Sequence, residues 1–155
     1  MMKSVLASIA CLALVAPALA NPPPDDALTG NWEIVDAAPA PWADAKERGN
    51  LAIQGKKLIK TPVSFGRTDV TSPAKALACK KADYEGTDYS PDAMFRGALL
   101  EPNQDRVVRE MGFPKGDVPG VDVTCESETL SYHFRDKTTI LVAFDNIVYT
   151  LKKTK

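Results

Sequence analysis

The stretch from Gly120 to Leu151, GVDVTCESETLSYHFRDKTTILVAFDNIVYTL, decides the fold, because apolar and polar residues alternate along most of it. Alternation with a period of two places the apolar side chains on one face of a β-strand. Short breaks at residues 127–128, 135–137 and 145–146 divide the stretch into four strands. The sequence therefore predicts a four-strand antiparallel meander here.

Shorter strands are predicted upstream of the meander. Residues 30–35 read as a half-buried strand, and residues 63–65 and 69–71 as a pair. Leu51–Gln54 and Lys57–Lys60 are predicted to form a hairpin, because a glycine in the first position of a two-residue turn suits type II′ geometry.

A helical insertion is predicted between these strands and the meander. Ser90-Pro91-Asp92 combines a capping serine, a proline for the first helical position and an acid at the positive helix end. A second helix is predicted over Asn103–Met111, ended by Gly112. The sequence thus predicts a mainly β fold, a small antiparallel β-barrel or curled sheet of about eight strands with two short helices inserted at residues 90–112.

The N-terminus predicts export. Lys3, an apolar run from Val5 to Val15 and Ala18-Leu19-Ala20 are typical of a cleaved signal peptide over residues 1–20. A membrane anchor would need about 20 apolar residues, more than this run supplies before Pro17. Lipid attachment at Cys11 would leave the Ala-x-Ala site unused. We therefore expect a soluble periplasmic or secreted protein with no membrane span.

The mature chain is expected to be one domain. Of 155 residues, 135 remain after the first 20 are removed, arranged as a Pro-rich leader over residues 21–27 and a β-rich domain over residues 28–155. The chain has 19 basic and 20 acidic residues, and only one basic residue lies in the signal. A mature net charge of −2 argues against nucleic-acid partners, which need a basic face.

Cleavage also changes the cysteine count. It removes Cys11 and leaves Cys79 and Cys125, which we predict to form a disulfide in an oxidising compartment. This bond would stabilise the folded state by about 4 kcal/mol, because closing the loop lowers the entropy of the unfolded chain. A reactive or metal-binding pair is the alternative, but the sequence has no C-x-x-C motif.

One short motif carries a family resemblance. Gly30-Asn31-Trp32 on the first strand is similar to the G-x-W start of lipocalin-type barrels. Export, small size, one disulfide and the final meander also resemble bacterial periplasmic β-barrel inhibitors of lysozymes and metalloproteases. The resemblance implies a barrel architecture and a role in blocking a partner.

The residues needed for catalysis are scarce. His133 is the only histidine, and we expect it on the polar, exposed face of its strand. G-x-S-x-G, Walker and H-E-x-x-H motifs are absent from the sequence. We therefore predict no enzyme activity, no metal site and no cofactor.

Two sets of residues remain as candidate sites. An acidic and aromatic segment could attract and anchor a protein partner, and we predict that it comprises Asp83, Tyr84, Glu85, Asp88, Tyr89 and Asp92. A second set, Trp32, Trp42 and Phe95, could line a cavity for a small apolar ligand. The alternative interpretation is that these three side chains fill the core.

These candidates lead to three functional hypotheses. The first is an exported binding domain, with inhibition of an enzyme such as a lysozyme or protease as its narrower form. The second is a lipocalin-like carrier of a small apolar molecule. The third is a small envelope hydrolase using carboxylates such as Asp83 and Glu85, which would face the same side of one strand.

Overall fold

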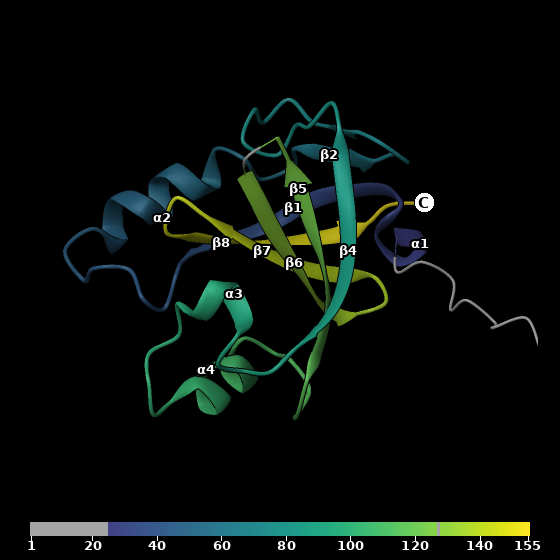
Figure 1. Cartoon of the computed structure of the whole chain (residues 1–155). Helices are drawn as coiled ribbons and strands as arrows, with labels where there is room; N and C mark the ends of the chain where they lie inside the picture. The colour runs from purple at the N-terminus through teal and green to yellow at the C-terminus, as the bar shows by residue number, and fades with distance from the viewer. Residues whose placement is uncertain (1–24, 127) are drawn as a thin grey trace, which may run out of the picture.

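The structure is a computed structural model that describes residues 25–126 and 128–155, so the predicted signal peptide lies outside the described residues. Its strands are β1 (Gly30–Pro39), β2 (Pro62–Phe65), β3 (Val70–Thr71), β4 (Ala82–Tyr89), β5 (Val118–Cys125), β6 (Glu128–Asp136), β7 (Thr139–Phe144) and β8 (Ile147–Lys153). They form one antiparallel sheet in the order β3-β2-β1-β8-β7-β6-β5-β4. The sheet curls into a nearly closed barrel (Figure 1), which confirms the predicted fold class.

The predicted meander is confirmed as β5 to β8, in which each strand pairs with the next along the chain. Asp145 and Asn146 join β7 to β8, and their φ angles are 51° and 58°. Two successive positive φ values are the signature of a type I′ turn, whose twist matches that of the flanking strands.

The barrel is closed at one end, where the outer strands β3 and β4 approach each other. Val70 forms an isolated antiparallel bridge with Cys79, and the Ala82 N–H donates to the Thr68 carbonyl at 2.9 Å. The predicted disulfide, Cys79–Cys125, joins this closing segment to the end of β5 across a Cα–Cα distance of 5.7 Å. These links reduce the unpaired sheet edge that β3 and β4 would otherwise expose.

The barrel interior is filled with side chains. Ile34 on β1 lies opposite Leu151 on β8, which in turn lies opposite Ile140 on β7. Aromatic rings fill the rest, and Phe65 meets Tyr132 edge-on at a centroid distance of 5.0 Å. The inward-facing side chains that are 3% exposed or less include Trp32, Ile34, Val63, Phe65, Tyr132, Ile140, Val142, Tyr149 and Leu151.

Four short helices accompany the sheet in the described part of the chain: α1 (Asp25–Leu28), α2 (Arg48–Lys56), α3 (Met94–Gly97) and α4 (Gln104–Glu110). α4 lies within the second helix predicted from the sequence, and Gly112 follows it with a φ of 87°. α3 begins four residues after Ser90, later than predicted. Figure 1 shows α3 and α4 together on one side of the sheet.

The predicted hairpin over Leu51–Gln54 and Lys57–Lys60 is wrong, because its first half lies in α2 and turns occupy residues 57–60. The reason is a tertiary contact. A Cβ atom on Gly55 would lie 2.9 Å from the Ala37 Cβ and 3.1 Å from the Ile147 Cγ2. The missing side chain lets α2 approach β1 and β8 closely, and this packing outweighs the local turn signal.

Candidate binding cleft between β6 and β7

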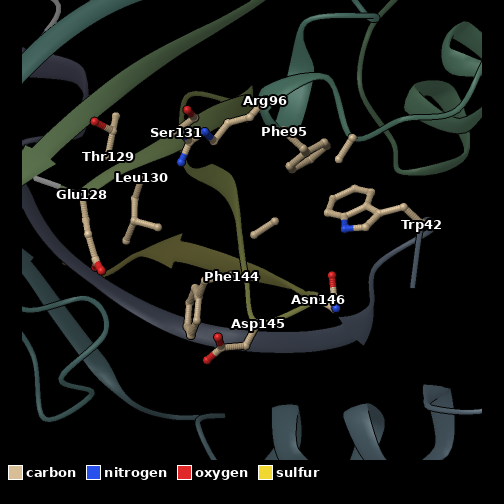
Figure 2. Close-up of a pocket in the computed structure, with 12 residues that line it drawn as sticks. Trp42, Phe95, Arg96, Glu128, Thr129, Leu130, Ser131, Phe144, Asp145 and Asn146 are labelled. Atoms are coloured by element: carbon tan, nitrogen blue, oxygen red, sulfur yellow. The ribbon is translucent and has the colours of Figure 1, made fainter. Parts of the chain in front are cut away.

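Neighbouring strands β6 and β7 part at one end of the sheet. They are paired from Asp136↔Thr139 to Tyr132↔Val142, after which their regular pairing stops. Residues 128–131 of β6 continue to pair with β5, while residues 143–144 of β7 continue to pair with β8. A cleft of about 400 Å³ opens between the two hairpins, with residues 128–131 on one side and 143–146 on the other (Figure 2).

Aromatic rings gather around this cleft. Trp42 and Phe95 stand at one end of it, with ring centroids 5.4 Å apart and planes tilted by 42° (Figure 2). Phe144 lies on the β7 side, stacked on Tyr149 at 4.4 Å. Because Trp42 and Phe144 are only half-buried, part of each ring remains accessible from solvent.

A turn with unusual backbone geometry presents Phe95 and Arg96 to the cleft. Their φ angles are 50° and 60°, followed by 72° at Gly97. Left-handed conformations at two successive non-glycine residues cost roughly 1–3 kcal/mol each, so surrounding contacts must hold them. The Phe95 N–H donates to His133 Nε2 at 3.1 Å, and the Phe95 ring packs on the imidazole and on Trp42.

The expected exposed position of His133 is wrong, because its side chain is fully buried. The imidazole faces outward from β6, where the rings of Tyr89 and Phe95 cover it at centroid distances of 4.5 and 4.6 Å. Burial lowers the pKa of His133 to about 4, and Nε2 accepts a hydrogen bond, so the neutral ring carries its proton on Nδ1. Among the described residues, Nδ1 has no hydrogen-bond partner.

Hydrogen bonds also hold the outer face of β4, β5 and β6. The Tyr89 and Ser131 hydroxyls donate to the same oxygen of Asp122. Burial and this carboxylate raise the pKa of Tyr89 to about 12, so the phenol stays a hydrogen-bond donor at neutral pH. Ser131 lines the cleft, and its hydrogen bond to Asp122 therefore ties the cleft to β5.

The acidic and aromatic segment predicted as a partner site lies on edge strand β4 and the turn after it. Its four acids, Asp83, Glu85, Asp88 and Asp92, are exposed. Its two tyrosines are turned into the fold: Tyr89 is 8% exposed, and the half-buried Tyr84 donates its hydroxyl to the Asp69 carbonyl. A role in binding stays a prediction for this segment, carried by the acids.

The three aromatic residues predicted to line a cavity lie in two different places. Trp42 and Phe95 are brought together at the cleft. Trp32 is 1% exposed in the core, where its indole N–H donates to the Leu28 carbonyl at 2.7 Å.

Several polar residues at the cleft were not predicted from the sequence. Arg96, Glu128, Asp145 and Asn146 all line it. The Asp-Asn turn signal was visible in the sequence, but no local pattern announces that β6 and β7 diverge beside it.

Within residues 25–126 and 128–155, no group of three or more His, Cys, Asp or Glu side chains could hold a metal ion. No helix in these ranges has the length and apolar character needed to cross a membrane. Comparison with protein-family models, with curated proteins and with solved structures gives no match for this chain.

Proposed function

We propose that this chain is an exported binding protein whose mature domain captures a protein partner in the cleft between β6 and β7. The parting of these two strands is the observation that carries the proposal. In an antiparallel sheet, alternate backbone N–H and C=O groups of a strand point toward its neighbour, so beyond Tyr132↔Val142 such groups of β6 and β7 would face the cleft. An extended segment of a partner pairs with such edges by strand addition.

The side chains around the cleft support the same role. Trp42 offers a partly accessible ring, and aromatic residues in pockets are frequent anchors of protein interfaces. Arg96 adds a positive charge, while Glu128 and Asp145 add negative charges. Charges of both signs would fix the direction and register of a bound segment.

Two other hypotheses receive less support from the geometry. A carrier with its ligand inside the barrel is disfavoured because large aromatic and aliphatic side chains fill the interior. Asp83 and Glu85, the carboxylates considered for a hydrolase, are exposed on β4 and do not line the cleft. Inhibition of a lysozyme or protease is the narrower form of the binding role, in which the captured segment belongs to the enzyme.

Affinity capture with matched variants tests the proposal. The mature domain would be used to retain envelope and secreted proteins, which are then identified by mass spectrometry. Ala143→Arg fills the cleft from a half-buried position, whereas Ile53→Arg adds the same charge at a position that is 64% exposed on α2. We expect a stoichiometric partner with the unmodified domain and with Ile53→Arg, and its loss with Ala143→Arg.

Hydrogen exchange on the complex supplies the direct readout of strand addition. Backbone amides of residues 128–131 and 143–146 should become protected when the partner binds. A partner that Ala143→Arg retains with unchanged affinity, or whose binding leaves these amides unprotected, would show that the cleft is not the site.

A further inference from the structure

A second groove lies toward the other end of β6. β5 pairs with β6 only as far as Gly120↔His133, although β5 continues to Val118 beside β4 and β6 continues to Asp136. The two strands therefore part again, and an open groove of about 580 Å³ lies between them. This volume falls within the range of small-molecule sites, roughly 300–1,000 Å³.

The lining of this groove is mainly apolar. Val121 and Phe134 are 1% and 8% exposed, and the exposed prolines Pro114 and Pro119 stand beside them. Pro119 has no N–H, so β5 cannot donate a backbone hydrogen bond into the groove at this position. The groove is therefore less suited than the cleft to an added peptide strand and better suited to a flexible apolar chain.

Basic side chains gather around this apolar lining. Arg135 and Lys153 are half-buried and Lys137 is exposed, and all three line the groove. Asp136 is the one acid in the lining, and its carboxylate already accepts hydrogen bonds from the Thr138 N–H and hydroxyl. This local positive excess is not a consequence of composition, because acids slightly outnumber bases in the whole chain.

Lys153 has a fixed place at the groove. Its Nζ donates to the Ala27 carbonyl at 3.1 Å and lies 5.3 Å from the centre of the Trp32 ring. Lysine stems commonly lie along apolar surface while the ammonium group stays at its edge. Lys153 therefore holds a cation beside the apolar lining of the groove.

We infer that this groove binds a free single-chain amphiphile with an anionic head group, such as a long-chain carboxylate. The alkyl chain would lie between Pro119 and Phe134, and the head group would pair with Lys137 and Lys153. This site is separate from the proposed cleft and does not depend on a protein partner there. It also differs from a ligand site inside the barrel, because the barrel interior is filled.

Titration of the mature chain with carboxyl-labelled dodecanoate, followed by NMR below the micelle concentration, tests the inference. We expect binding of one dodecanoate per chain, with butanoate and dodecyltrimethylammonium each weaker by about ten-fold or more, a difference of roughly 1.4 kcal/mol. Butanoate lacks the apolar chain, and dodecyltrimethylammonium carries the opposite charge, so the two controls separate the two parts of the site.

Two matched pairs of variants and one cleft variant sharpen the test. Lys137→Glu should weaken dodecanoate binding by about ten-fold, whereas Lys57→Glu, the same change at the exposed residue that directly follows α2, should not. Pro119→Asp puts a charge beside the alkyl chain and should abolish binding, while Pro73→Asp should leave it intact. Ala143→Arg, which fills the cleft, should bind dodecanoate normally.

The inference is overturned if both twelve-carbon amphiphiles bind equally, or if Pro119→Asp binds dodecanoate as the unmodified chain does. Binding of phospholipid vesicles without binding of free dodecanoate would also overturn it. So would a concentration-dependent dimer that Pro119→Asp dissociates, because a second copy would then cover the groove. Contacts from Pro22–Pro24 to Phe134 that dodecanoate cannot displace would assign the groove to the chain's own leader.

Discussion

The stability of this protein should fall steeply in mild acid because of His133. The imidazole is buried as the neutral form beneath Tyr89 and Phe95, and burial lowers its pKa from the ordinary 6.5 to about 4. Between these two values the unfolded chain binds a proton that the native protein excludes, so acid favours unfolding. This difference in pKa contributes about 3 kcal/mol to the free energy of unfolding. The contribution is present in full above pH 6.5 and is lost as the pH falls toward 4.

A negative charge acts on His133 in the opposite direction. Asp122 on β5 raises the pKa of the imidazole, but less than burial lowers it. Protonation would also remove the lone pair on Nε2 that accepts the Phe95 N–H. The left-handed turn at Phe95 and Arg96 would lose this support, and partner binding at the cleft should weaken in the same pH range.

His133→Gln isolates this effect. Glutamine can still accept a hydrogen bond through its amide oxygen but does not titrate, and the variant contains no histidine at all. Urea denaturation at pH 7, 5.5 and 4, followed by tryptophan fluorescence at constant ionic strength, gives the free energy of unfolding. We expect the variant to lose about 3 kcal/mol less than the unmodified protein between pH 7 and pH 4.

Comparing the change with pH, and not the absolute stability, cancels any packing cost of the glutamine side chain. The remaining pH dependence of the variant comes from carboxylates and is common to both proteins. Equal losses of stability in the two proteins would refute the reasoning, as would a native-state titration of His133 near pH 6.5 by NMR.

Three further predictions concern stability. Replacing Cys79 and Cys125 together by alanine should lower the free energy of unfolding by about 4 kcal/mol, measured by urea denaturation, and an unchanged midpoint would contradict the assigned role of the disulfide. Gly55→Ala should destabilise the protein by about 1–3 kcal/mol because of overpacking against the sheet. Gly49→Ala in the same helix, where the added Cβ would meet open space, should raise the free energy of unfolding by up to about 1 kcal/mol. Similar thermal midpoints for the two variants would contradict the close packing of α2. Tyr89→Phe should cost about 1 kcal/mol by loss of its hydrogen bond to the β5 carboxylate, and an ultraviolet titration that places this phenol near its ordinary pKa of 10 would contradict its burial.

The sequence alone was sufficient for the meander and for the disulfide. Alternation around Tyr132, Val142 and Tyr149 reports directly which side of each strand meets the core, and short turns leave antiparallel pairing as the simple connection. The pairing of Cys79 with Cys125 follows from the small number of cysteines left after the predicted cleavage.

Residues 51–60 and His133 needed the tertiary structure, because their state depends on segments distant in sequence. Gly55 reads locally as a turn residue, and only its contact with Ala37 and Ile147 makes it a packing residue in a helix. His133 alternates with apolar neighbours like an exposed strand residue, but Tyr89 of β4 and Phe95 of α3, both earlier in the chain, cover it.

The cleft and the groove arise in the same way. The cleft lies where β6 parts from β7, and the groove lies where β6 parts from β5 at its other end. A strand's own sequence specifies which face is apolar, but where its pairing stops is decided by the twist of the whole sheet and by the elements packed on it. The sequence therefore determined the strands of the meander, and the tertiary structure decided where β6 separates from its neighbours.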